Sequence, residues 1–329
     1  MSDQPLWQQP DWQGEAHAWI RSALDKNNLQ LTGEIEQPHI RQWSTVMTVP
    51  ANNGILYFKA SASIFAHETA LTDYLARFRP EIFPELLATD TRRHWMLMRD
   101  AGTPLRHFIR TEKSIARWKD VLPLYVDIQK EMAERTIHLL ALGVMDRRLA
   151  KLPTMFENLI VDESAMLLDQ EESLTSEEYA RLKDFGPEFA RMCEKLASFG
   201  IPETIHHDDF HDGNIFVRNE RITFTDWGES AVTHPFFTLV VMMRGVDNSI
   251  GTDFSPESEQ VRDMYLQHWT SYAPVNELKS IAKLAQCIGY VNRALTWKMS
   301  LDDMPEELKP EYAIAVPSYL KDFINGVGI

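Results

Sequence analysis

The segment from Ile205 to Gly228 constrains the fold of this chain more than any other stretch. It reads IHHDDFHDGNIFVRNERITFTDWG, so acids, imidazoles and an amide stand directly before two short apolar runs. The runs 215–217 and 222–224 consist of β-branched and aromatic residues, which favour strands. Gly213 and these strands argue against one long helix through the acids, so we expect a fold that contains both helices and sheets.

The polar residues of this segment have a spacing that suits phosphoryl transfer from a nucleotide. Asp209 can orient a hydroxyl group and accept its proton. Asn214 and Asp226 can supply oxygen ligands to magnesium if the backbone between them reverses. We expect His207 to brace the loop through hydrogen bonds and Gly213 to permit the tight backbone that aims Asn214 inward.

Four further polar residues of the loop, His206, Asp208, His211 and Asp212, receive no definite role from the sequence. They can act as loop scaffolding, be exposed to solvent, or contact the substrate or water bound to magnesium.

The first third of the chain alternates between strand and helix patterns. Residues 31–60 are rich in β-branched and aromatic residues, and Asn53-Gly54 between apolar runs predicts a hairpin turn. Residues 66–78 show helical periodicity, with Glu68 on the same face as the apolar residues. A further strand is expected at 95–98, so the first third of the chain is rich in strands.

Two residues of this region are placed to contact nucleotide phosphates. Lys59, at the end of the apolar run 55–58, can reach the α- and β-phosphates of ATP, and Glu68 on the next helix can hold it in place. Ser44, near the turn between the first two strands, can offer its hydroxyl and N–H groups to a phosphate. The segment Met98-Arg99-Asp100 is where a hinge would run, with backbone groups that read the adenine.

The chain after residue 98 is mostly helical in pattern. Apolar residues recur at helical spacing from Leu122 to Met132, and Thr175 followed by Glu178 predicts a capping box that opens a helix. We therefore expect an N-terminal nucleotide-binding lobe over 1–98. A helical lobe over 99–329 would carry the catalytic and metal-binding loops and the acceptor site.

A resemblance to a known family rests on the same residues. The pattern His207-x-Asp209-Phe210-His211-x-Gly213-Asn214, followed by Asp226-Trp227, resembles the signature of the aminoglycoside phosphotransferase and choline kinase-like family. In that family the signature is roughly H-G-D-L-H-x-G-N followed by I-D-W. The order of Lys59, Glu68 and the hinge segment agrees with the same plan.

The resemblance implies an α+β, protein-kinase-like bilobal fold, with a small antiparallel-sheet N-lobe and a larger, mostly helical C-lobe. It also implies that ATP and magnesium bind and that a small-molecule hydroxyl accepts the phosphate. It would make Asp209 the catalytic base, Asn214 and Asp226 the magnesium ligands, and Lys59 the phosphate contact that pairs with Glu68.

Two features depart from the family pattern. After the metal-binding Asp the family usually has G-D-P-x-x-D-L, whereas residues 233–239 read THPFFTL, with Thr238 where an acid is expected. This departure argues against a close relationship to the drug-modifying members of the family. It does not affect the residues expected to transfer the phosphate. Lys59 and Glu68 are also close in sequence, so the loop between them must be short.

Composition limits the class of protein further. The formal net charge of −15 argues against a nucleic-acid partner and is compatible with a cationic acceptor. No apolar run approaches the roughly 18–20 residues that span a bilayer, and the N-terminal residues do not resemble a secretory signal. Cys193 and Cys287 are the only cysteines, which excludes a disulfide framework. We therefore expect a cytoplasmic protein without a membrane partner.

Other chemistries fit the acidic segment less well. Asp208, Asp209 and Asp212 match the D-D-x-x-D cluster of terpene synthases, but that chemistry needs a long helix in an all-helical fold. A His/Asp hydrolase is disfavoured because the imidazoles do not follow H-x-H-x-D-H or H-E-x-x-H spacing. Two alternatives stay open: a kinase-like protein that binds nucleotide without turnover, and a protein-substrate kinase. The second lacks a recognisable A-P-E segment after Asp226.

The sequence thus predicts a small-molecule kinase that moves the γ-phosphoryl group of ATP, with magnesium, to a hydroxyl of an amino sugar, sugar or amino alcohol. It leaves open which acceptor is used, whether ATP or GTP is preferred, and the oligomeric state.

Overall fold

The chain folds into two compact units that interleave in sequence. The computed structural model describes residues 5–328; residues 1–4, with which the predicted N-terminal lobe begins, and residue 329 lie outside the described part. The first unit contains the chain up to Leu105 together with Asn214–Gly228, and the second contains Arg106–Gly213 and the chain from Glu229 onward. The lobe boundary at residue 98 stays a prediction; by residue contacts, the later segment 214–228 groups with the N-terminal part.

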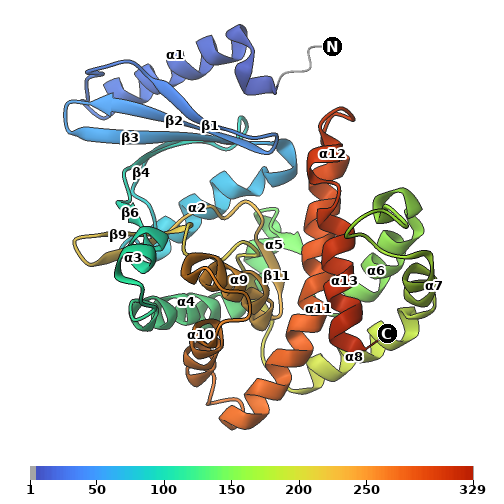
Figure 1. Ribbon diagram of the computed structural model, residues 1–329. Coiled ribbons are helices and arrows are strands. Elements are labelled where there is room, and N and C mark those ends of the chain that lie inside the picture. The colour runs from blue at the N-terminus through green and yellow to red at the C-terminus, as the bar shows by residue number, and fades with distance from the viewer. Residues whose placement is uncertain (1–4, 329) are drawn as a thin grey trace. The chain divides into compact units, whose positions relative to one another are not determined.

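A five-stranded antiparallel sheet forms the centre of the first unit (Figure 1). In spatial order its strands are β1 (Glu36–Ile40), β2 (Ser44–Ala51), β3 (Gly54–Ser61), β5 (Trp95–Arg99) and β4 (Leu86–Asp90). The predicted hairpin is confirmed, because Ala51 pairs with Gly54 and leaves a two-residue loop between β2 and β3. Gly54 has a φ of +119°, a conformation that favours glycine.

Helices and a second small sheet complete this unit. They are η1 (Leu6–Gln8), α1 (Pro10–Lys26), η2 (Ser63–Phe65), α2 (His67–Phe78), and strands β6 (Thr103–Pro104), β9 (Ile215–Arg218) and β10 (Arg221–Phe224). The strands β10, β9 and β6 form an antiparallel sheet in that order, so the two strands predicted after the acidic segment are confirmed.

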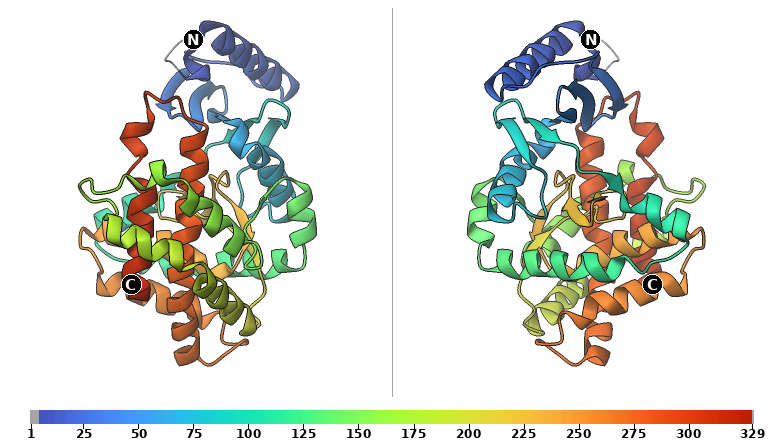
Figure 2. Two further views of the ribbon diagram at one scale, coloured as in Figure 1. Left: turned by 90° about the vertical axis from the view of Figure 1, so that its right-hand side faces the viewer. Right: turned by 90° about the vertical axis from the view of Figure 1, so that its left-hand side faces the viewer.

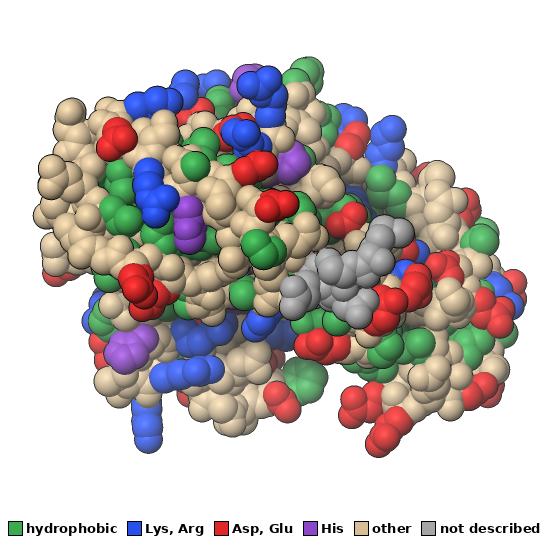
Figure 3. All heavy atoms as spheres, turned by 90° about the horizontal axis from the view of Figure 1, so that it is seen from above, with side chains coloured by type: hydrophobic (Ala, Val, Ile, Leu, Met, Phe, Trp, Pro, Cys, Tyr) green, Lys and Arg blue, Asp and Glu red, His purple; other side chains and the backbone are tan. Residues whose placement is uncertain are grey.

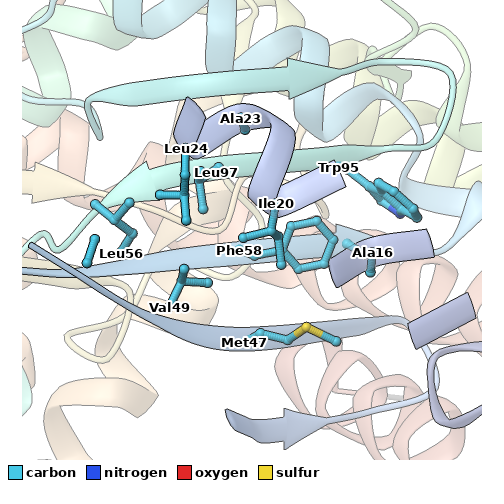
Figure 4. Close-up of a cluster of buried hydrophobic side chains, with 12 residues drawn as sticks. Ala16, Ile20, Ala23, Leu24, Met47, Val49, Leu56, Phe58, Trp95 and Leu97 are labelled. Carbon is cyan, nitrogen blue, oxygen red and sulfur yellow. The ribbon is translucent and has the colours of Figure 1, made fainter. Parts of the chain in front are cut away.

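Helix α1 covers one face of the five-stranded sheet with an apolar core (Figure 4). Ile20 and Leu24 of α1 are buried with Phe58 of β3 and Leu97 of β5. Side chains alternate between the two faces of a strand, so Phe58 under α1 places its neighbour Lys59 on the opposite face.

Lys59 lies inside β3 rather than at its end, which corrects the strand end expected from the sequence. The strand continues to Ser61 because Lys59 pairs with Val46 of β2 on one side and with Met96 of β5 on the other. A lysine in a central strand keeps its backbone fixed by both neighbours, and its side chain therefore projects from a rigid point.

The second unit is mostly helical (Figures 1 and 2). Its helices are α3 (Leu105–Glu112, which begins at the boundary), α4 (Trp118–Ala133), α5 (Thr136–Ala141), α6 (Leu152–Val161), η3 (Glu163–Met166), α7 (Ser176–Asp184), α8 (Gly186–Ser198), η4 (Pro235–Thr238), α9 (Leu239–Ile250), α10 (Pro256–Gln267), α11 (Val275–Asp302), α12 (Lys309–Tyr312) and α13 (Ala315–Val327). The long helix α11 packs along α13, and it also contacts α6 and α8.

Three short strands position the acidic loop in this unit. Strands β7 (Met145–Asp146), β11 (Ala231–Thr233) and β8 (Thr204–His206) form a sheet in that order, with β11 in the centre. Because β8 ends at His206, the loop that carries Asp209 starts directly from this sheet. The predicted capping box is also confirmed, since the Thr175 side chain accepts from the Glu178 N–H group at the start of α7.

Surface charges of both signs lie intermixed on the face seen from above (Figure 3). Several exposed arginines of the first unit pair with acids, for example Arg77 with Asp73 and Arg93 with Asp90. Within residues 5–328, none of the helices combines the length and the apolar content that a membrane span would require.

Candidate functional site

Lys59 forms a buried ionic cluster with two carboxylates of the first unit. Its Nζ lies 2.5 Å from Glu68 Oε1 and 2.6 Å from Asp226 Oδ1. Lys59 is 7% exposed and Glu68 only 1%, so this pair is shielded from water. Ser61 donates a further hydrogen bond to the other Glu68 oxygen. The predicted Lys59–Glu68 pair therefore exists.

The charges around Lys59 keep it protonated. Burial alone would lower the pKa of Lys59, but the negative charges of Asp226 and Glu68 outweigh it and raise the pKa above its ordinary value. A fixed positive charge on a rigid central strand suits a phosphate contact.

Backbone geometry brings Asn214 and Asp226 to the same end of the β9–β10 hairpin. Ile215 pairs with Phe224, and the Thr225 N–H group donates to the Asn214 carbonyl oxygen at 3.0 Å. Asp226 itself has a φ of +63°, an uncommon conformation for a residue with a side chain. Strained positions of this kind cluster at functional sites because the surrounding structure must hold them.

The residues after Asp226 anchor it. Trp227 is fully buried and packs against Phe83 with ring centroids 5.4 Å apart. At Gly228 an added Cβ would lie 3.2 Å from Glu68 Oε2, so the chain passes tightly beside the ionic cluster. A small residue at this position thus lets Asp226 and Glu68 share Lys59.

One cavity of about 310 Å³ in the first unit is lined by every residue that the sequence assigned to nucleotide or metal binding. These residues are Ser44, Lys59, Glu68, Met98, Asp100, Asn214 and Asp226. Val46, Tyr57, Met96 and Phe216 supply apolar walls between them. A cavity whose lining combines apolar side chains with a lysine and oxygen donors is suited to a ring with an attached chain of phosphates.

One of the lining residues, Asp100, uses its side chain in a way that the sequence did not indicate. Asp100 accepts from the Gly102 N–H group at 2.9 Å and pairs with Arg218 of β9. Its carboxylate therefore shapes the turn after β5. Ser44 is buried at the first position of β2, next to the turn where a phosphate-covering loop was expected.

The oxygen donors of the cavity fit a magnesium ion. Asn214 offers an amide oxygen and Asp226 a carboxylate, and both line the cavity. Magnesium prefers oxygen ligands and usually keeps several waters or phosphate oxygens besides one or two protein groups. The side chain of Asp226 is 50% exposed, so an ion can approach it from the cavity.

Asp209, the predicted base, belongs to the second unit and is held there by two cationic or polar partners. His211 Nε2 lies 3.3 Å from Asp209 Oδ2, and Arg293 Nη2 lies 3.3 Å from Oδ1. Burial would raise the pKa of Asp209, but the hydrogen bond from His211 and the charge of Arg293 lower it well below its usual range. Asp209 is therefore a stable carboxylate.

The neighbouring acid Asp208 is a structural anchor. It is 3% exposed and accepts hydrogen bonds from His206 at 3.0 Å, from Asn292 at 2.9 Å and from Thr296 at 2.5 Å. Burial would raise its pKa, whereas the His206 hydrogen bond and the Arg293 charge lower the pKa of Asp208 to about 2. With these partners, Asp208 ties the loop to α11.

Asp212 anchors the other end of the loop. It is fully buried and accepts from Arg106 Nε at 2.8 Å and from the Ser249 hydroxyl at 2.5 Å. At Gly213 an added Cβ would lie 2.8 Å from His211 Cε1 and 3.0 Å from Arg106 Cζ. Gly213 does not have a positive φ, so glycine suits this position through the close approach of these side chains.

His207 and Phe210 fix the middle of the loop. Phe210 stacks on Tyr125 with ring centroids 3.7 Å apart, and the His207 N–H group donates to the Tyr125 hydroxyl at 3.4 Å. Tyr125 also bonds Thr238 at 3.2 Å, the residue that stands where the family pattern has an acid. Thr238 is 1% exposed, so it supports the core beneath the loop.

Sequence reasoning missed two charged residues beside Asp209. Arg293 of α11 is 5% exposed and forms ion pairs with Glu229 and Asp209, and its Nη1 lies 3.6 Å from Asp208. An arginine inside a mostly apolar helical stretch is the one signal that could have drawn attention to it.

Comparisons with known proteins agree with this architecture. Residues 59–278, more than half of the chain, match the phosphotransferase enzyme family. No curated protein matches the chain in sequence.

Solved structures of kinases share the fold at low identity. Choline kinase LicA from Streptococcus pneumoniae superposes with a TM-score of 0.62 at 13% identity, over 95% of this chain and 99% of that one. Ethanolamine kinase from Plasmodium vivax gives a TM-score of 0.61 at 12% identity, over 93% and 87%. Aminoglycoside phosphotransferase APH(3'')-Id from Streptomyces rimosus, solved with ADP and streptomycin, gives 0.50 at 15% identity, over 83% and 97%.

These likenesses confirm the predicted α+β, protein-kinase-like fold. Together with the match over residues 59–278, they support the predicted relationship. The chain belongs to the phosphotransferase enzyme family.

Proposed function

We propose that this protein transfers the γ-phosphoryl group of ATP, with magnesium, to a hydroxyl group of a small molecule. One observation carries the proposal: the residues that the sequence selected for nucleotide and metal binding line a single cavity around the Lys59 cluster. The printed names of the structural neighbours, choline kinase, ethanolamine kinase and an aminoglycoside phosphotransferase with ADP, support a small hydroxyl compound as the acceptor.

The first unit would hold the phosphate donor. Lys59 would contact the α- and β-phosphates, with Glu68 keeping its ammonium group in place. The backbone of the segment from Met98 to Asp100 would bind the base. Asn214 and Asp226 would hold magnesium, which when bound neutralises charge between the β- and γ-phosphates.

Asp209 would act on the acceptor hydroxyl. Because its pKa is lowered, Asp209 stays ionised and accepts the hydroxyl hydrogen bond before the reaction starts. In a loose transition state the bond between the γ-phosphorus and ADP breaks as the acceptor oxygen bonds to phosphorus, and the proton passes late to Asp209. A weakly basic carboxylate is sufficient for such a late transfer, so His211 and Arg293 would serve to orient it.

The cytoplasm is the compartment that we propose for this reaction. Cys193 and Cys287 are both free and buried, which suits a reducing environment.

Substitution of Asp209 tests the proposal. Purified protein would be screened for ATP consumption against sugars, amino alcohols and aminoglycosides. Asp209→Asn should lower kcat by about 10²–10⁴-fold, the usual contribution of a positioned base. The affinity for ATP should stay unchanged, because Asp209 does not line the nucleotide cavity. Asp184→Asn, at an exposed acid of the same unit, should keep wild-type turnover.

Equal residual turnover in wild type and Asp209→Asn would refute catalysis at this residue and favour a protein that binds nucleotide without turnover. Asp226→Ala should abolish magnesium-dependent turnover. A rate close to wild type in that variant would refute the metal assignment.

A further inference from the structure

A second cavity, of about 450 Å³, lies within the second unit. Residues of β7, α6 and α11 line it. Its walls are largely apolar, formed by Met145, Met155, Leu295 and Met299, while Arg147 and Lys298 bring positive charge to the lining. None of the residues that the proposed phosphoryl transfer uses lines this space, which we call the Arg147 cavity.

Arg147 is an unusual residue to find in such a wall. Its backbone N–H group donates to the Val232 carbonyl oxygen at 3.0 Å, which fixes the chain directly after β7. The side chain is 7% exposed, yet Nη1 has no hydrogen-bond partner and the guanidinium forms no ion pair within residues 5–328. Burying a cation without a partner is costly, and such groups are rarely retained without a reason.

The other charged side chains that line the cavity, Asp146, Lys298 and Asp302, already have ion-pair partners. Asp146 accepts from Arg148 Nε at 2.8 Å and Nη2 at 2.7 Å. Lys298 Nζ lies 2.5 Å from Asp302 Oδ1 and 2.9 Å from Asp162 Oδ2. Within residues 5–328, Arg147 is therefore the charged residue of the lining that has no ion-pair partner.

The acid that acts on Arg147 from nearby does not neutralise it by direct contact. Asp208 exerts a favourable charge on Arg147, but its oxygens bond His206, Asn292 and Thr296. Burial remains the larger influence and lowers the pKa of Arg147 from its ordinary value. Because Arg147 belongs to the lining, an anion inside the cavity would give its guanidinium the ion pair that it lacks within residues 5–328.

We propose that the Arg147 cavity binds a small organic anion, a carboxylate or a phosphate monoester that carries an apolar body. Arginine presents donors in a planar fork that matches both kinds of oxyanion. Flexible methionines and leucine adapt to apolar groups of varied shape. The Arg147 cavity shares no residue with the nucleotide cavity.

Calorimetric titration with matched six-carbon probes tests this site. Hexanoate and hexyl phosphate carry the two candidate anionic groups, and hexanol and hexylamine have the same chain without a negative charge. The two anionic probes carry no alcohol hydroxyl that could accept a phosphate. Their binding therefore does not depend on turnover. At least one anionic probe should bind tenfold or more tightly than hexanol, and comparison of the two anions identifies which oxyanion the site prefers.

Arg147→Met should weaken binding of the preferred anion by tenfold or more and leave hexanol binding unchanged. Arg191→Met, at an exposed arginine of α8 that pairs with Glu188, removes the same charge elsewhere and should bind like wild type. Equal binding of all four probes, no binding of either anion, or full anion binding by Arg147→Met would overturn the proposal.

Thermal unfolding separates a binding role from a structural one. Because Arg147 is buried without a partner, Arg147→Met should melt no lower than wild type in the absence of probe. The preferred anion should raise the melting temperature of wild type and not that of Arg147→Met.

Arg147→Lys keeps the charge but loses the planar fork, so it should bind the preferred anion with intermediate affinity. If both variants melt at a lower temperature than wild type and Arg147→Lys keeps the wild-type affinity for the anion, Arg147 has a structural role instead.

Discussion

A single buried guanidinium, that of Arg293, contacts three acidic side chains around the Asp209 loop. It reaches Asp209, Asp208 and Glu229 from one position on α11. A planar guanidinium can bond several carboxylate oxygens at once, whereas a lysine ammonium is a compact point charge that cannot reproduce this geometry. Arg293 is thus a positioning residue for Asp209 within the proposed reaction.

We expect Arg293→Lys to lower kcat by about 10–100-fold, the scale of a small misplacement of a reacting group. The KM for ATP should stay near wild type, since Arg293 does not line the nucleotide cavity. Steady-state kinetics at varied ATP would check both values.

The matched control is Arg244→Lys, at an arginine of α9 whose acidic partner is Asp322. It should keep wild-type kinetics. An equal loss in the control, or a rise in KM for ATP in Arg293→Lys without a change in kcat, would contradict a positioning role for Arg293.

Residues of the site differ in how far the sequence could reveal them. Asp209, Asn214 and Asp226 belong to one short motif, and their spacing carries the chemical signal. Lys59 and Glu68 could be identified from the order of a strand and a helix along the chain. The structure places Lys59 Nζ 2.5 Å from Glu68 Oε1. Arg293 stands 84 residues from Asp209 in sequence, so only the packing of α11 brings the two together.

At the scale of elements, the capping box of α7 offers a local test of stability. The Thr175 hydroxyl accepts from the Glu178 N–H group at 3.1 Å, and the Glu178 carboxylate accepts from the Thr175 N–H group at 2.8 Å. Thr175→Ala removes the first bond and should lower the free energy of unfolding by about 1 kcal/mol. Urea denaturation would measure this change.

The same substitution should leave turnover unchanged, because Thr175 lines neither cavity. Thr175→Ser keeps the capping hydroxyl and serves as the control, with stability close to wild type. A loss above about 2 kcal/mol, beyond the range of helix caps, would show that Thr175 does more than cap α7.

Elements that depend on neighbouring residues were predictable, and those that depend on distant pairing were less so. The β2–β3 turn and the α7 capping box follow from residues within a few positions of each other. The true end of β3 does not, because its last residues continue the strand only through pairing with β2 and β5. The sequence therefore placed Lys59 at a strand end, whereas sheet pairing places it inside the strand.

For the whole molecule, the switch from strand to helix periodicity was sufficient to predict the α+β class. It did not reveal that the β9–β10 hairpin belongs to the first unit, since strand β6, which pairs with β9, is only two residues long. The charge balance within the second unit was equally hidden, because the formal net charge of −15 counts acids without showing which ones are buried together.

Glu229, an acid that is largely buried beside Asp209 and Arg293, predicts how the stability of the whole molecule depends on pH. Burial raises the pKa of Glu229, and Asp209 and Asp208 add to the effect against the opposing charge of Arg293, so that it reaches about 8. Between the unfolded pKa of 4.5 and about 8, the folded protein binds more protons at Glu229 than the unfolded chain does. Stability from this group is therefore complete below the unfolded pKa and is lost as the pH rises through the folded one.

Glu229→Gln imitates the protonated side chain at every pH, so its melting temperature should fall less than that of wild type between about pH 5 and pH 9. Thermal unfolding of both proteins across this range would measure the difference, and contributions from other groups such as His211 are common to the two. Glu259→Gln, at an exposed acid of α10, should follow the wild-type curve. If Glu229→Gln also runs parallel to wild type, Glu229 does not take up a proton on folding, and its pKa is not raised in the folded protein.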